Sequence, residues 1–366
     1  MRDVQRLVQG ILDELVGSGA ELGLQAAVYR RGELVVDAVA GTADPATGRP
    51  VAPDTPFYAA STGKGVTATV VNVLVERGVL GYDAPVVELW PEYGAHGKAG
   101  TTLRHLLTHS AGIPVLPHAT TWDGLCDWTA TCAAIADTAP AWTPGAASGY
   151  HTLTAGFVLG ELVRRATGSP ISRVLAEEVA GPLGVADELF LGVPERAADR
   201  SARFVDDPEG TALFAELVAG VSTEESELVS DAALANRVEV LRHDIPGIGT
   251  TSARAVARMY AALLDEVEGV RLLPPARAGE VATLATAGTD RTVGGPAAYG
   301  LGYSVGAVGH APSAPTLFGA AGVGGSAAFA DTATGVSVAV TKNRLDPTQF
   351  VAFSRVRAAV AEAFAA

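Results

Sequence analysis

Ser61 and Lys64 are the residues of this chain whose types and spacing best suit covalent chemistry. They begin and end the tetrad Ser-Thr-Gly-Lys, which leads into an apolar, helix-like run over residues 65–75. Residues three apart lie on one face of a helix, so the amine falls within reach of the serine hydroxyl. Serine is a weak nucleophile unless a neighbouring base takes its proton, and lysine can be that base. The spacing alone also fits a helix N-cap serine followed by a solvated lysine.

Tyr150 is a second candidate for proton transfer. It follows a break at Pro144-Gly145 and stands at the start of a long apolar stretch that runs to Thr167. A phenol held near a lysine ammonium is pushed toward phenolate and can relay a proton. The alternative is an aromatic core residue, which is the usual role of tyrosine.

Three other patterns are weaker matches to known sites. Residues 302–306 read Gly-x-Ser-x-Gly, but residues 307–312 contain Gly and Pro and cannot form the helix that a nucleophile elbow requires. His105 and His109 have metal-ligand spacing but no nearby third ligand, so we expect no metal site and local hydrogen bonding instead. The glycine-rich residues 319–325 lack the Gly-Lys-Ser/Thr ending of a phosphate loop. They indicate close backbone approach at a sheet edge.

Composition limits the classes of partner. The 366 residues are 48% hydrophobic and 18% charged, which is typical of a globular chain with a large core. The formal net charge is −14, which argues against nucleic acid and against an anionic membrane surface, since both require clustered Lys and Arg. We therefore expect a small-molecule partner, with no nucleic acid and no membrane.

Cysteine usage and the first residues suggest a compartment. The two cysteines, Cys126 and Cys132, exclude a disulfide framework, and two free thiols fit better than one local bridge. The first residues form a polar, helical segment without a signal-peptide pattern, and no run of about 20 apolar residues follows. The expected location is cytoplasmic.

The order of predicted elements indicates an α+β fold. A helix over residues 4–16 and a hairpin over residues 24–40 come first, and strands over residues 300–342 and a helix over residues 351–364 come last. The chain between them is mainly helical, with helices predicted over residues 122–138 and 150–167 and an acidic helix over residues 211–240. We predict an antiparallel sheet flanked by helices, formed by residues 1–80 and 245–366, with a mainly helical domain over residues 81–244.

Several motifs, taken in chain order, resemble those of the class C β-lactamase-like serine hydrolases. They are the Ser61-x-x-Lys64 tetrad, the segment over residues 103–114, Pro-Gly before Tyr150, and the glycines over residues 322–325. The similarity runs from about residue 24 to the C-terminus, and the branch that it most resembles is the family VIII carboxylesterases. It implies a β-lactamase/transpeptidase-like fold with the active site between the two domains. It also implies Ser61 as the acylated nucleophile, Lys64 and Tyr150 as the general base pair, and no cofactor.

The chain departs from the family pattern at two motifs. The Tyr-x-Asn motif of β-lactamases is here Tyr150-His151-Thr152, and the Lys-Thr-Gly motif aligns with Ala320-Ala321-Gly322, which has no cation. We expect the backbone N–H groups of Ser61 and Val323 to form the oxyanion hole. Tyr58, His151, Ala320 and Gly322 are the expected substrate-binding residues.

The sequence thus predicts a serine acyl hydrolase for small uncharged esters. An alternative is a transacylase that passes the same acyl group to an amine or alcohol in a biosynthetic pathway. A third interpretation, from another class, is a catalytically silent homologue that binds a ligand.

Overall fold

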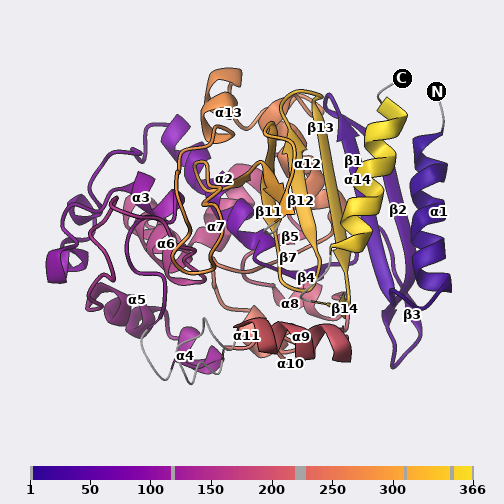
Figure 1. Ribbon diagram of the computed structural model, residues 1–366, viewed down its shortest axis with the longest axis horizontal. Helices are drawn as coiled ribbons and strands as arrows, with labels where there is room; N and C mark the ends of the chain where they lie inside the picture. The colour runs from indigo at the N-terminus through magenta and orange to yellow at the C-terminus, as the bar shows by residue number, and fades with distance from the viewer. Residues whose placement is uncertain (1–2, 117–119, 219–227, 309–310, 347–349, 365–366) are drawn as a thin grey trace.

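A seven-stranded antiparallel sheet, built from both ends of the chain, is the centre of the fold (Figure 1). The computed structural model describes residues 3–116, 120–218, 228–308, 311–346 and 350–364. The strand order is β3-β2-β1-β13-β12-β11-β8. The strands are β1 (Gly23–Arg30), β2 (Glu33–Asp44), β3 (Arg49–Pro50), β4 (Phe57–Ala60), β5 (Leu189–Phe190), β6 (Val205–Asp206), β7 (Gly249–Thr251), β8 (Ser304–Val305), β9 (Ala307–Val308), β10 (Ala311–Pro312), β11 (Leu317–Ala321), β12 (Ala327–Asp331), β13 (Val336–Lys342) and β14 (Arg344–Leu345).

Helices fill the middle of the chain and cover the sheet. They are α1 (Val4–Gly17), α2 (Thr62–Glu76), α3 (Leu103–Leu107), α4 (Trp122–Leu125), α5 (Trp128–Ala136), α6 (Thr154–Thr167), α7 (Ile171–Leu175), α8 (Glu195–Ala198), α9 (Pro208–Val218), α10 (Ala232–Ala235), α11 (Val238–Leu241), α12 (Ala253–Leu264), α13 (Pro275–Val281) and α14 (Val351–Phe364). Among the described residues there are also two 3₁₀ segments, η1 (Val86–Glu88) and η2 (Pro91–Gly97), and one π-helical segment, η3 (Ala176–Ala180).

The large sheet is buried on both faces. Side chains of a strand alternate between faces, and in β1 Leu24, Ala26 and Val28 join the cluster under α1 and α14. Ala27 and Tyr29 join the larger cluster on the opposite face, where α12 packs. The sequence of β1 is therefore apolar on both sides rather than alternating.

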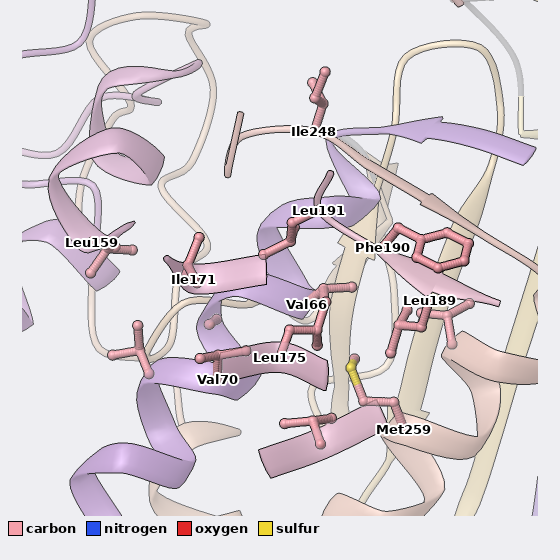
Figure 2. Packing of buried hydrophobic residues seen from close by; sticks show 14 of the residues in the cluster. Val66, Val70, Leu159, Ile171, Leu175, Leu189, Phe190, Leu191, Ile248 and Met259 are labelled. Atoms are coloured by element: carbon pink, nitrogen blue, oxygen red, sulfur yellow. The ribbon is translucent and has the colours of Figure 1, made fainter. Parts of the chain in front are cut away.

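Helix α2 is the buried axis of the larger cluster. Thirteen of its fifteen residues are buried. Figure 2 shows Val66 and Val70 of α2 beside Leu175 of α7, with Ile248 and Met259 in the same cluster. A helix that is apolar all round must be enclosed by other elements, so α2 is held in place from several sides.

Close approach of α2 to residues 246–249 depends on Gly63. A Cβ on Gly63 would lie 2.2 Å from the carbonyl carbon of Ile248 and 2.3 Å from the N of Gly249. The Thr67 hydroxyl donates to the Pro246 carbonyl at 2.7 Å, which fixes the same segment one turn further along α2. A side chain at position 63 would separate the helix from this segment.

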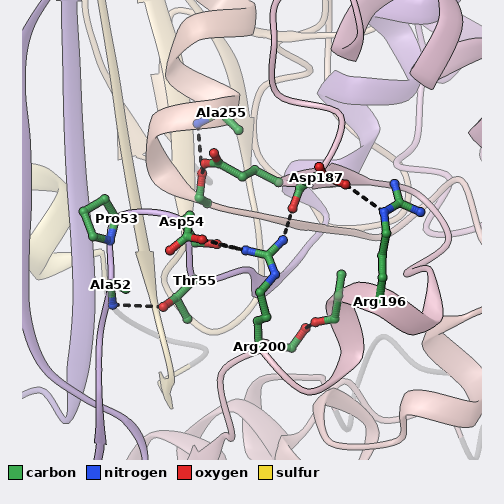
Figure 3. A network of polar contacts seen from close by, with 12 residues as sticks. Ala52, Pro53, Asp54, Thr55, Asp187, Arg196, Arg200 and Ala255 are labelled. Carbon is green, nitrogen blue, oxygen red and sulfur yellow. Dashed lines mark hydrogen bonds and ion pairs between the residues drawn. The ribbon is translucent and has the colours of Figure 1, made fainter.

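The strand that leads into α2 is anchored by a polar network at its start. β4, β7 and β5 form a small antiparallel sheet in the order β4-β7-β5. Arg200 donates to the carbonyl and carboxylate oxygens of Asp54 at 2.8 and 2.9 Å and also to the Asp187 carbonyl (Figure 3). Thr55 accepts from the N–H of Ala52 at 2.9 Å. The turn before β4 is thereby tied to the chain that follows β5.

The predicted fold class is confirmed, while several boundaries differ. The long helix predicted from Tyr150 begins at Thr154, and the helix predicted over residues 122–138 is broken because Asp127 caps a new helix by accepting from the N–H of Ala130. Of the acidic helix predicted over residues 211–240, α9, α10 and α11 are observed, and residues 219–227 lie outside the described part. The division into two domains stays a prediction.

Two further expectations can be compared with the structure. Cys126 and Cys132 are both free thiols, as predicted. In the described ranges, no helix combines the length and apolar character needed to cross a membrane.

Gly63→Ala should lower the free energy of unfolding, because the added methyl collides with backbone rather than with a flexible side chain. Overpacking of this kind costs about 1–3 kcal/mol. Gly10→Ala, in α1 with no atom within 4 Å of the new Cβ, is the matched control and should stabilise by about 0.5–1 kcal/mol. Urea denaturation measures both, and a Gly63→Ala protein as stable as Gly10→Ala would contradict the account.

Candidate active site

Ser61 and Lys64 meet at the start of α2. Ser61 directly precedes the helix, after Ala60, whose φ of +43° lies in the left-handed region that non-glycine residues seldom adopt. The Lys64 Nζ donates to the Ser61 Oγ at 2.9 Å and to the Gly247 carbonyl at 2.9 Å. The Ser61 side chain makes no N-cap hydrogen bond, so the N-cap alternative does not hold. The amine is in position to exchange a proton with the hydroxyl.

Tyr150 lies against the same amine. It sits in an irregular segment four residues before α6, and the Lys64 Nζ is 4.9 Å from the centre of its ring. Tyr150 is half-buried. The structure thus brings Ser61, Lys64 and Tyr150 together, with the tyrosine meeting the lysine through its ring.

The turn between β11 and β12 carries Val323 and is tied to α2. The Ser326 carbonyl accepts from the Gly322 N–H at 2.8 Å and from the Thr62 hydroxyl at 3.3 Å. Within the described ranges, the N–H groups of Ser61 and Val323 donate to no other group. Two unpaired N–H groups on linked segments are what an oxyanion hole requires. Their joint role stays a prediction.

Ala320 lies in β11 beside α2, and Gly322 directly follows that strand. A Cβ on Gly65, one turn after the serine, would be 3.3 Å from the Cβ of Ala320. A Cβ on Gly322 would be 2.1 Å from the Ala59 carbonyl oxygen, which confirms close backbone approach in this glycine-rich stretch. β8 pairs with β11 at Phe318 and Gly319, so Ala320 lies beyond the end of that pairing. Contact of Ala320 and Gly322 with substrate stays a prediction.

His151 does not fit the predicted substrate contact. Its side chain is buried, its Nε2 accepts from the Ile113 N–H at 3.0 Å, and its Nδ1 faces the Gly149 carbonyl at 2.6 Å. A carbonyl can only accept and an N–H can only donate, so the ring is neutral with its proton on Nδ1. Both nitrogens are used inside the protein. The next residue, Thr152, is the exposed one and takes the place of the motif's Asn.

Tyr58 is also buried. Only 3% of it is exposed, its hydroxyl shares a hydrogen bond of 2.7 Å with Ser230, and its ring packs edge-on against Phe204. All four residues of β4 are buried, which its sequence does not reveal, and contact of Tyr58 with substrate stays a prediction. Tyr58 is a core residue with a satisfied hydroxyl.

The two motif histidines make local contacts. His105 accepts through Nδ1 from the Thr102 N–H at 3.2 Å and so caps α3, as expected. His109 accepts from the His151 N–H at 3.1 Å, and its ring lies 4.9 Å from that of Tyr150. Burial, followed by His151 and Lys64, holds the pKa of His109 well below its usual value. The described residues contain no cluster of three His, Cys, Asp or Glu suited to a metal ion.

Cations near the end of β13 are already paired. Lys342 is buried and contacts the Glu21 carboxylate at 2.6 Å, while Arg344 contacts Asp207 at 2.9 Å. Neither is available as a substitute for the missing lysine of the Lys-Thr-Gly motif. The site therefore lacks both the motif cation and these two replacements for it.

Sequence reasoning missed Asp290 and Tyr299, which lie beside Tyr150. Asp290 is buried and accepts from the Tyr150 N–H at 3.1 Å, and the Tyr299 ring stacks on Tyr150 with centres 6.4 Å apart. Burial, with the bond to Asp290 next, raises the pKa of Tyr299. No motif surrounds either residue, so only the folded chain identifies them.

The fold and this serine–lysine–tyrosine arrangement define a serine enzyme of the β-lactamase/transpeptidase-like class. The sequence pattern of the beta-lactamase family matches residues 8–363, and the chain belongs to that family. This confirms the resemblance inferred from the motifs.

Individual relatives agree with this assignment. The esterase/beta-lactamase LipL of Mycobacterium tuberculosis is 34% identical over 87% of this chain and 76% of its own length. Esterase EstB of Burkholderia gladioli is 34% identical over 52% of this chain and 53% of its own. The crystal structure of a family VIII carboxylesterase superposes with a TM-score of 0.86 at 29% identity, covering 98% of this chain and 97% of that one.

Stability should fall with acidification because of His151. Burial lowers the pKa of His151 to about 4. Between about pH 6.5 and 4 the unfolded chain binds a proton that the folded chain does not, so the free energy of unfolding decreases as the pH falls. One such group contributes at most about 1.4 kcal/mol per pH unit.

The measurement is urea denaturation from pH 7 to 4 for the wild type and His151→Gln. The variant should be less stable at pH 7 but should lose less stability across the window. His243→Gln, at an exposed position, is the control and should keep the wild-type slope. Equal slopes for His151→Gln and the wild type would contradict the assignment.

Proposed function

We propose that this protein is a carboxylesterase-type serine acyl hydrolase that works through an acyl-enzyme on Ser61. The observation that carries the proposal is the 2.9 Å contact between the Lys64 Nζ and the Ser61 Oγ at the start of a buried helix. A nucleophile and base within hydrogen-bond reach, with the base held by a third group, is the recurring arrangement of covalent catalysis. Here the third group is the Gly247 carbonyl.

In the proposed reaction, Lys64 and Tyr150 act as one proton-transfer unit. The Ser61 hydroxyl gives its proton to this unit as Oγ attacks the ester carbonyl carbon. The N–H groups of Ser61 and Val323 hold the negative oxygen of the tetrahedral intermediate. Its collapse breaks the C–O bond, and the departing alcohol takes the proton. Water then attacks the acyl-enzyme by the same route and frees Ser61.

Small uncharged esters are the proposed substrates. The pairing of Lys342 and Arg344 with buried or half-buried carboxylates, and the alanines at positions 320 and 321, leave these positions without an anchor for a substrate carboxylate. The exposed side chains of Val115 and Val293 support the binding of apolar substrate groups at the edge of the site. The Thr152 N–H donates to the carbonyl that precedes Val115, and the Val293 N–H donates to Asp290, so both valines lie close to the Tyr150 segment.

Transfer of the acyl group to an amine or alcohol remains the alternative outcome of the same intermediate. The net charge of −14 supports a small-molecule ester or acyl donor as partner rather than nucleic acid. A cytoplasmic location remains a prediction of the composition. A silent binding homologue is disfavoured by the contact of Ser61, Lys64 and Tyr150.

Turnover of a short-chain nitrophenyl ester should greatly exceed turnover of a chromogenic cephalosporin. A charge-assisted hydrogen bond to the cephalosporin carboxylate contributes about 1.5–3 kcal/mol where it exists, or about ten- to a hundredfold in rate. Steady-state kcat/KM for the two substrates measures the difference, and Ser61→Ala should remove both activities while leaving the fold intact. Comparable kcat/KM values for the two substrates would show that other groups of the protein bind the cephalosporin carboxylate. Ester turnover by Ser61→Ala would contradict the assignment of Ser61 as the nucleophile.

A further inference from the structure

We propose that Asp290 is the positioning residue for Tyr150, an inference that rests on the proposed role of Tyr150 in proton transfer. Asp290 does not touch the serine or the lysine. It holds the backbone of Tyr150 directly and the face of its ring through Tyr299.

The Asp290 carboxylate is surrounded by donors. Only 2% of the residue is exposed. Its Oδ1 accepts from the N–H groups of Tyr150, Thr292 and Val293 at 3.1, 2.8 and 2.9 Å. Its Oδ2 accepts from the Tyr299 hydroxyl at 2.6 Å. Two of these four donors stabilise its own loop, and the other two reach Tyr150 and the ring stacked on it.

Tyr150 needs such an anchor because regular structure does not hold it. The residue lies before the first turn of α6, in a stretch without helix or strand pairing. One further contact ties the two segments together: the Arg291 N–H donates to the Ser148 carbonyl at 2.9 Å. The loop that carries Asp290 therefore runs beside residues 148–150, although it is 140 positions away in sequence.

Two neighbouring rings then fix the direction of the phenol. The Tyr299 ring is inclined by 22° to that of Tyr150, and the buried ring of His109 lies 4.9 Å from Tyr150 and 4.6 Å from Tyr299. Since the Tyr299 hydroxyl is committed to Asp290, its ring cannot rotate away without breaking that bond. The Tyr150 ring is left facing the Lys64 Nζ at 4.9 Å. A displacement of about 1 Å at such a group can cost roughly a hundredfold in rate.

A double-mutant cycle between Asp290→Ala and Tyr150→Phe tests the inference with the nitrophenyl ester. If Asp290 acts through Tyr150, Asp290→Ala should lower kcat at least about tenfold, with KM changed less than about threefold. In the Tyr150→Phe background the same change should cost less than about threefold, because the group that Asp290 positions is already absent. Equal losses in both backgrounds would overturn the inference.

Companion variants separate positioning from general stability. Asp290→Asn keeps an oxygen that can accept from the Tyr150 N–H and should recover most of kcat, whereas an Asn variant as slow as Asp290→Ala would contradict positioning through this hydrogen bond. Asp13→Ala, on the exposed side of α1, should match the wild type. Should Asp290→Ala fail to fold, Tyr299→Phe takes its place in the cycle. Its loss should likewise vanish in the Tyr150→Phe background, and persistence there would overturn the inference.

The cycle also distinguishes this inference from the proposed function. If Tyr150→Phe alone left kcat unchanged, the proposed catalytic role of Tyr150 would be wrong, and so would the positioning role of Asp290. If Tyr150→Phe is damaging but Asp290→Ala costs the same in both backgrounds, only the positioning role falls.

Discussion

The close packing of α2 against residues 246–249 is the constraint on which the rest of the site depends. Gly63 permits the approach, and the approach puts the Gly247 carbonyl 2.9 Å from the Lys64 Nζ. The Lys64 Nζ is thereby held by two hydrogen bonds, one to this carbonyl and one to the Ser61 Oγ. The long, flexible lysine side chain is thus ordered when the protein folds. The entropic cost of ordering it arises during folding and does not add to the activation barrier of the reaction.

The same packing links the proposed catalytic residues to both ends of the chain. α2 is enclosed by the larger hydrophobic cluster, and its first hydroxyl, that of Thr62, bonds to the Ser326 carbonyl in the β11–β12 turn. That turn carries Val323. The proposed nucleophile and base at the start of α2 therefore lie near the turn that carries Val323, although the two segments are more than 250 positions apart in sequence. The fold explains how a chain with short, individually weak motifs can assemble one site.

The local parts of this account could be predicted from the sequence. The Ser61–Lys64 contact follows from helical spacing, and the sheet built from both chain ends follows from the order of apolar runs. Tyr150 followed from the resemblance carried by several motifs in order. Burial was harder to predict. Tyr58 and His151 were expected to contact substrate, whereas the structure covers them and pairs their polar atoms inside.

Long-range contacts without a motif could not be predicted at all. Asp290 reaches Tyr150 across 140 positions, and its neighbours carry no pattern that marks them. The two-residue strand β5 could not be predicted from the sequence either. Its structure depends on its pairing with β7 rather than on its own two residues. Such features come from tertiary packing and need the folded chain.

The most direct test of the central claim is to locate the covalent intermediate. The wild-type protein is mixed with a slow-turnover activated ester, quenched in acid during the first turnovers, and its peptides are analysed by mass spectrometry. The account predicts one acyl group on the peptide that contains Ser61, and much slower acylation of a Lys64→Met variant. Ester turnover with no acyl group on Ser61, or unchanged acylation of Lys64→Met, would contradict it.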